Sequence, residues 1–119
     1  MAIHVVSAKW FGKGKKPNHI YIGRPSILGN PISTKPSKYT IRTVATNKEA
    51  VEEYHHWLRA QWNHDGPVKE ELLRLARLYK EQGTLYLVCW CKKKINDDIP
   101  CHGDVLRDAI EGIIAKGLV

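Results

Sequence analysis

The chain has 119 residues, a length that suits a single hydrophobic core, so we predict one domain over residues 1–119. No apolar stretch is long enough to cross a bilayer, and the N-terminus lacks the basic start and long apolar run of a signal peptide. We therefore expect a cytoplasmic protein that is neither exported nor membrane-bound. Three cysteines, an odd number, argue against a closed disulfide framework and favour reduced thiols or metal ligands.

The charge of the chain is very uneven. Residues 1–48 contain nine Lys or Arg and no Asp or Glu, whereas residues 49–119 contain ten basic and twelve acidic residues. The net +7 is therefore +9 from the first segment and −2 from the second. A positive excess confined to one segment predicts a surface that meets phosphate, as a nucleotide or as a nucleic-acid backbone. The alternative is a basic loop that serves only solubility.

The first third of the chain alternates short β-branched runs with loops rich in Gly, Pro and Lys. We predict strands at residues 3–8 and 19–22, loops at 10–18 and 32–40, and at 41–45 either a third strand or an extended lead into the next helix.

The remainder of the chain has helical periodicity with one break. Residues 46–49 have the spacing of a capping box and predict a helix to about Trp62, and a second helix is expected from Pro67 to about Lys80. The apolar run to Cys91 after Gly83 predicts a central strand, and residues 105–116 predict a last helix. This order indicates a small α/β domain, in which three or four strands are flanked by three helices in two or three layers, as in a Rossmann-like arrangement.

Residues 21–31 combine two glycines, two prolines, one arginine and short polar side chains. Glycines allow unusual backbone angles and prolines restrict the chain, so a stiff loop is expected. An arginine offers a planar fork of donors that suits phosphate. The loop is therefore a candidate cradle for an anion, and the alternative is a structural turn. Its candidate ligand-binding residues are Gly23, Arg24, Ser26, Gly29 and Asn30.

A second polar cluster follows the predicted central strand, with Cys89 and Cys91 in that strand and Cys101, His102 and Asp104 near the start of the last helix. The carboxyl end of a strand beside a helix start is where α/β folds place ligands, and a helix N-terminus lowers the pKa of a thiol. The last three residues are therefore candidate catalytic groups, as acid, base or nucleophile. The alternative is structural, with buried cysteines and an aspartate that caps the helix.

The same cluster also contains zinc-type ligands, namely Cys89, Cys91, Cys101 and His102. The spacing argues against a zinc site, because the paired Cys-x-x-Cys knuckle is absent. Side chains two apart on a regular strand also begin about 6–7 Å apart, so they converge poorly without a bend.

The chain resembles an uncharacterised family of small phage and bacterial domains. The resemblance rests on the Tyr-Ile-Gly-Arg-Pro-Ser and Leu-Gly-Asn-Pro segments (residues 21–31), Tyr54 and Trp57-Leu58, Cys89-Trp90-Cys91, and the Cys-His-Gly-Asp-Val-Leu segment (residues 101–106). This family is filed as a domain of unknown function. The resemblance runs from Ile20 to the last helix, and the segment between the second and third cysteines is longer and richer in lysine here. It implies that both motifs matter, and it supplies no reaction.

Two functions follow from these observations as expectations. In the first, the two motifs form one pocket that binds a phosphate-bearing ligand, most simply a nucleotide. Arg24 and loop amides would hold the phosphate, Asn30 would orient the ligand, and His102 and Asp104 would face the part where hydrolysis or transfer occurs. In the second, the chain is a nucleic-acid-binding module stiffened by zinc, in which Trp10, Phe11 or Trp62 stacks on bases. A protein that binds a host factor is a third alternative.

Overall fold

The protein is described here by a computed structural model of the 119-residue chain. The structure describes residues 2–11, 16–23, 26–36, 38, 40–89 and 101–119. Of the residues named above, Arg24, Pro25, Trp90 and Cys91 lie outside the described residues, as do Lys13 and Lys15 of the basic loop. The side chains of Trp10 and Phe11 are likewise not described.

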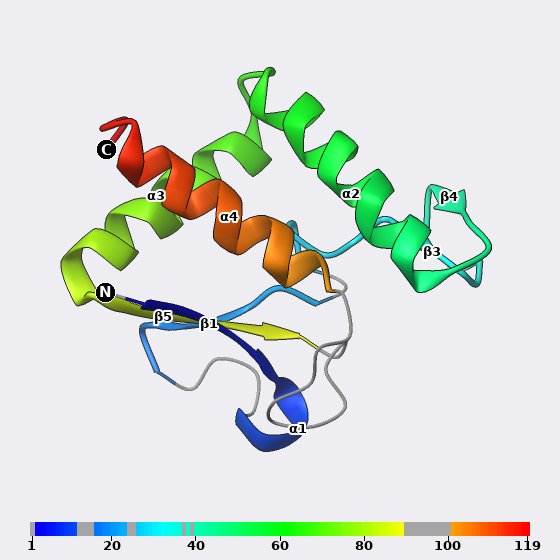
Figure 1. The fold of residues 1–119 in the computed structure, drawn as a ribbon, viewed down its shortest axis with the longest axis horizontal. Helices are drawn as coiled ribbons and strands as arrows, with labels where there is room; N and C mark the ends of the chain where they lie inside the picture. The colour runs from blue at the N-terminus through cyan, green and yellow to red at the C-terminus, as the bar shows by residue number, and fades with distance from the viewer. Residues whose placement is uncertain (1, 12–15, 24–25, 37, 39, 90–100) are drawn as a thin grey trace.

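A parallel sheet of three strands forms the base of the molecule (Figure 1). It contains β1 (Ala2–Ser7), β5 (Thr84–Cys89) and β2 (His19–Tyr21), in the order β1-β5-β2. The strand predicted from its apolar run to be central is thus confirmed as β5. Alternate side chains of β5 point to the same face, and those of Leu85, Leu87 and Cys89 are fully buried in the core.

Three long helices lie on one face of this sheet, so the domain has two main layers (Figure 1). They are α2 (Asn47–Trp62), α3 (Pro67–Gln82) and α4 (His102–Ala115). Each buries one apolar stripe toward the sheet or its neighbours, as the period of 3.6 residues predicted. A short helix, α1 (Ala8–Phe11), follows β1 in the segment predicted to be a loop.

The helix ends match the signals in the sequence. The side chain of Thr46 accepts a hydrogen bond from the backbone N–H of Glu49, 3.2 Å away, which caps α2 as predicted. Gly83 has φ +78° and ends α3 in the left-handed conformation that glycine favours. Gly117 also has positive φ, and its N–H and that of Leu118 bond back to the last turn of α4.

Two features of the fold differ from the prediction. The segment 41–45, predicted as a third strand or an extended lead into the next helix, contains the strand β4 (Arg42–Thr43), which pairs outside the main sheet with β3 (Ile32–Ser33), a strand in the segment predicted to be a loop. In addition, α4 begins at His102, three residues before the predicted start, because Cys101 and Asp104 cap it. Among the described residues, no helix is both long and apolar enough to span a membrane.

Candidate functional site at the carboxyl edge of the sheet

The three strands of the sheet are parallel, so their carboxyl ends meet at one edge. Ser7 pairs in register with Cys89, and Tyr21 pairs with Val88, so β1, β2 and β5 end at the same level. Helix α4 begins beside this edge, and the loop that contains the first motif leaves β2 there. In open parallel sheets this edge is where ligands bind. The fold therefore brings both sequence motifs to one place.

His102 makes the direct connection between the two motifs. Its Nε2 lies 2.7 Å from the backbone oxygen of Ile22, the residue before the glycine of the first motif. Because a carbonyl oxygen only accepts, Nε2 must carry the proton of this hydrogen bond. The His102 side chain is buried, and its ring meets the ring of Tyr54 edge-on with centroids 5.1 Å apart. Segments 80 residues apart in sequence are thus tied together inside the core.

Two cysteine thiols lie next to this histidine. The Sγ atoms of Cys89 and Cys101 are 3.2 Å apart, and both side chains are fully buried. The Sγ of Cys101 lies 3.8 Å from Nδ1 of His102 and accepts a hydrogen bond from the N–H of Gly103 at 3.4 Å. Three of the four predicted zinc-type ligands thus lie in one region but are not arranged to hold a metal ion, and the fourth, Cys91, lies outside the described residues.

Asp104 occupies the first turn of α4 and closes its capping box. One carboxylate oxygen accepts a hydrogen bond from the N–H of Cys101 at 3.2 Å, and the other lies 3.6 Å from the guanidinium of Arg107. A negative charge in this position is stabilised by the helix dipole. The contacts of Asp104 are therefore those of a helix cap, as in the structural alternative considered from the sequence.

The loop after β2 folds as two successive turns. The N–H of Ser26 bonds to the oxygen of Gly23 at 2.8 Å, and the N–H of Gly29 bonds to the oxygen of Ser26 at 2.9 Å. Gly23 is buried, and a Cβ there would overlap the ring of Tyr21, so a larger residue at this position would have to displace that ring. The hydroxyl oxygen of Ser26 is shielded from solvent and has no hydrogen-bond partner among the described residues. A buried hydroxyl without a partner is costly unless a ligand or water satisfies it.

Asn30 and Tyr54 anchor the end of this loop to α2. The Asn30 amide nitrogen donates to the oxygen of Ala50 at 3.2 Å, and its amide oxygen accepts from the N–H of Ile32 at 2.9 Å. The hydroxyl of Tyr54 donates to the oxygen of Leu28 at 2.7 Å. Both side chains are buried, so in this structure Asn30 braces the loop with the same atoms that would contact a ligand.

Sequence analysis named Tyr54 only among the residues that carry the family resemblance and did not include it among the candidate site residues. Burial of a tyrosine usually requires a partner for its hydroxyl, which was the one available signal. No signal in the sequence could single out the carbonyl of Ile22, because every residue carries a backbone carbonyl. Among the described ranges, no group of three His, Cys, Asp or Glu side chains is arranged to hold a metal ion.

Comparison with known proteins identifies one family. A family model described as Domain of unknown function (DUF4326) matches residues 5–112, a range that contains both motifs, all of α2 and α3 and most of α4. No curated protein and no solved structure gives a significant match. The chain therefore belongs to the family of DUF4326 domains.

Proposed function

We propose that this domain binds a phosphate-bearing ligand, in the simplest case a nucleotide, at the carboxyl edge of its sheet. The observation that carries the proposal is the 2.7 Å contact between Nε2 of His102 and the oxygen of Ile22, which makes the Gly-Arg-Pro-Ser loop and the start of α4 neighbours. A stiff loop and the N-terminus of a helix of 14 residues then face the same edge. Backbone amides and the helix dipole both favour an anion in such a place.

The roles within this site follow from the contacts of each residue. Arg24 would supply the charge that holds the phosphate, and the unpartnered hydroxyl of Ser26 would donate to one of its oxygens. Buried His102 and Asn30 would act by holding the loop in its binding conformation, since their polar atoms bond to Ile22 and to α2 and β3. Hydrolysis or transfer at a bound nucleotide would require Asp104 or Cys101 to leave its capping contacts.

Calorimetric titration against a panel of nucleoside mono-, di- and triphosphates tests this proposal. Arg24→Ala should weaken the binding of the best ligand by about 10- to 100-fold, since hydrogen bonds to charged groups contribute about 1.5–3 kcal/mol. Lys48→Ala is the matched control, because it removes one positive charge from the exposed start of α2. If no nucleotide binds, or if both variants bind alike, the proposal fails. Chromatography of the same samples would detect any turnover, which Asp104→Asn should then abolish.

A second candidate function has its own observation. The hydrogen bond to Ile22 requires a proton on Nε2 of His102, so Nδ1 carries a lone pair in the neutral form of the ring, and it lies 3.8 Å from the Sγ of Cys101. Zinc-bound histidines commonly donate their other N–H to a backbone carbonyl in this manner. The corresponding proposal is a zinc-stiffened module that binds nucleic acid through the basic first segment, and zinc binding would require these side chains to move, because among the described residues they are not arranged to hold a metal ion. Metal analysis should then find one zinc per chain, lost in Cys101→Ser, and nucleic-acid affinity should fall steeply with salt.

A further inference from the structure

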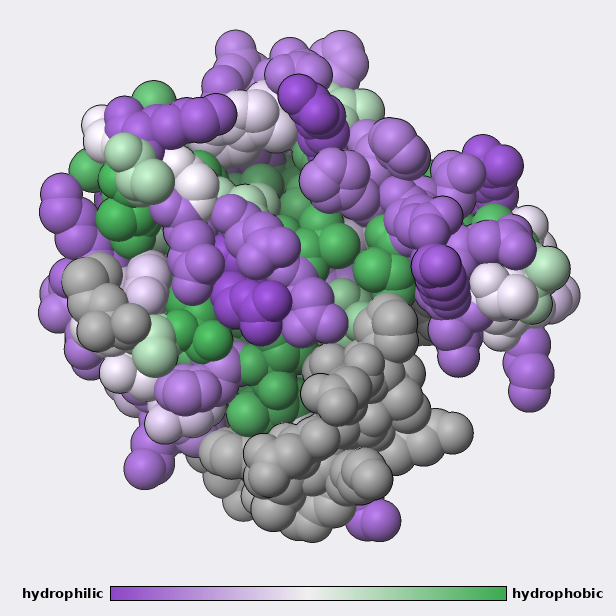
Figure 2. Space-filling view, in the orientation of Figure 1, coloured by the Kyte–Doolittle hydropathy of each residue, from purple (hydrophilic) through white to green (hydrophobic). Residues whose placement is uncertain are grey.

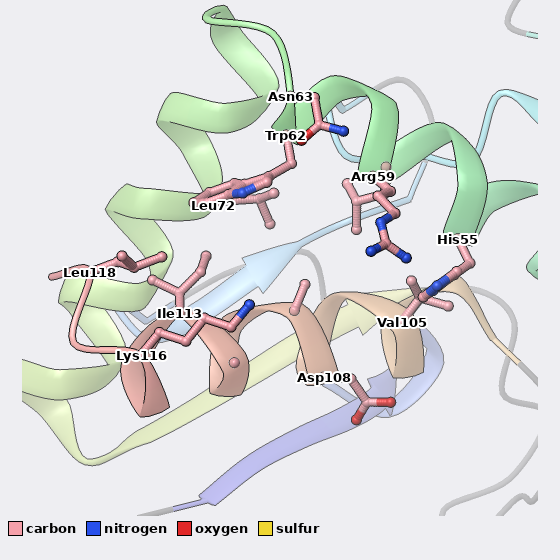
Figure 3. A pocket seen from close by; sticks show the side chains of 13 residues that line it. His55, Arg59, Trp62, Asn63, Leu72, Val105, Asp108, Ile113, Lys116 and Leu118 are labelled. Atoms are coloured by element: carbon pink, nitrogen blue, oxygen red, sulfur yellow. The ribbon is translucent and has the colours of Figure 1, made fainter.

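A groove opens between α2 and α4, on a different part of the molecule from the site above (Figure 3). Its volume is about 470 Å³, within the range of small-molecule sites. The lining is mostly apolar, and Figure 2 shows hydrophobic residues at the surface between these two helices. The apolar lining residues are Leu58, Trp62, Leu72, Val105, Ala109, Ile113 and Leu118.

The groove is open partly because α4 carries a glycine there. A Cβ built on Gly112 meets no other atom within 4 Å, so the helix surface has unfilled space at this position. Glycine costs about 0.5–1 kcal/mol relative to alanine inside a helix. This residue also has a negative φ that any amino acid adopts. Neither backbone geometry nor close packing therefore requires glycine at position 112. A side chain at this position would instead extend into the groove and reduce its volume.

Two positive side chains border the groove. Figure 3 shows that the guanidinium of Arg59 and the amine of Lys116 both lie between α2 and α4. Neither side chain has an ion pair or hydrogen bond in the described part of the chain. The lining also includes one acidic residue, Asp108, whose carboxylate lies 3.5 Å from Nε of Arg107. Two cations against one acid leave the lining with a net positive charge.

We propose that this groove binds a small organic anion with an apolar body. The apolar floor would cover the body of the ligand, and Arg59 or Lys116, which lie apart in Figure 3, would pair with its carboxylate, sulfate or phosphate group. Burial of apolar area supplies the affinity of such a site, and the two cations orient the ligand. The proposal concerns different residues from the carboxyl-edge site, so it stands or fails independently of the proposed function.

Two fluorescent probes separate the apolar and the charged parts of this proposal. The first is 8-anilinonaphthalene-1-sulfonate, and the second is N-phenyl-1-naphthylamine, which has the same aromatic body without the sulfonate. The sulfonate should bind the folded protein at one site per chain and about tenfold more tightly than the neutral probe, as expected for one charge-assisted contact. Arg59→Gln and Lys116→Gln should each reduce this preference. Arg77→Gln, which removes an exposed charge on α3, should leave it unchanged.

Filling the groove provides a second, independent test. Gly112→Leu should weaken both probes at least about tenfold, because its side chain occupies the space where their aromatic body would lie. Ala115→Leu is the control, since it adds bulk on the same helix outside the lining. Urea unfolding of each variant ensures that the probes report the folded state.

Three results would overturn the proposal. One is equal affinity for the two probes, and another is equal binding by the Gly112 and Ala115 variants. The third is a dimer in sedimentation that Gly112→Leu dissociates, which would mean that a second copy of the chain fills the groove.

Discussion

Replacement of His102 by phenylalanine is the sharpest test of how the two motifs are joined. Phenylalanine keeps an aromatic ring of similar size against Tyr54 but has no N–H to donate to Ile22. The carbonyl of Ile22 belongs to a fully buried residue, so the change leaves a buried acceptor without this partner. Loss of one side of such a pair costs about 1–3 kcal/mol. His102→Ala would add a cavity, and aromatic-to-alanine changes in a core cost about 3–5 kcal/mol.

Urea unfolding, monitored by tryptophan fluorescence, measures these differences in the free energy of unfolding. The total stability of such a domain is about 5–15 kcal/mol, so even the smaller loss would shift the midpoint clearly. His102→Gln is the informative comparison, because its amide retains a donor and should recover part of the loss. If the phenylalanine variant were as stable as the wild type, or no less stable than the glutamine variant, the bond to Ile22 would not be what holds the motifs together.

Three further predictions concern packing, anchoring and pH. Gly103→Ala should destabilise the fold by about 1–3 kcal/mol, because its Cβ would lie 2.6 Å from a methyl group of β1. Gly112→Ala on the same helix should stabilise the fold by about 0.5–1 kcal/mol, so the two variants should shift the urea midpoint in opposite directions. Tyr54→Phe should cost about 1–3 kcal/mol, because the Leu28 carbonyl loses its donor, and thermal unfolding should show the loss. Burial raises the pKa of Tyr79 above 10.0, so the folded state holds this proton more tightly than the unfolded state. The stability that this proton contributes should therefore be fully present below about pH 10 and should decline as pH rises through the folded-state pKa. Urea unfolding at several pH values measures this decline, which should be less steep in Tyr79→Phe.

The helices and the central strand could be predicted because their signals are local. Each helix repeats its apolar residues with the helical period, and Thr46, Pro67 and Gly83 mark ends by their own chemistry. A strand at 41–45 was one of two alternatives, and β4 lies within it, but β3 and its pairing with β4 could not be predicted, because a strand of two residues carries no periodicity. The early start of α4 was missed since its N-cap is a cysteine, which is outside the usual capping residues.

For the candidate site, sequence could predict that the two motifs meet. A loop that leaves one parallel strand and a helix that follows its neighbour must come together at the carboxyl edge. The orientation of His102 was beyond sequence analysis, because its partner is a backbone oxygen 80 residues away with no signature in the sequence. The same holds for Asn30, whose amide bonds to backbone groups of Ala50 and Ile32.

These contacts divide the site into a frame, formed by His102, Asn30 and Tyr54, and a binding surface that includes Ser26, and mutations can distinguish the two. His102, Asn30 and Tyr54 bond to the backbone of Ile22, Ala50 and Leu28, so changes to them should lower stability before they affect a ligand. Ser26 is different, because its hydroxyl has no hydrogen bond to lose among the described residues. Ser26→Ala should therefore not lower the free energy of unfolding, while it weakens nucleotide binding. If instead Ser26→Ala bound nucleotide normally and the frame variants lost binding at full stability, the ligand would contact the buried side chains directly, and the roles proposed for loop and frame would be reversed.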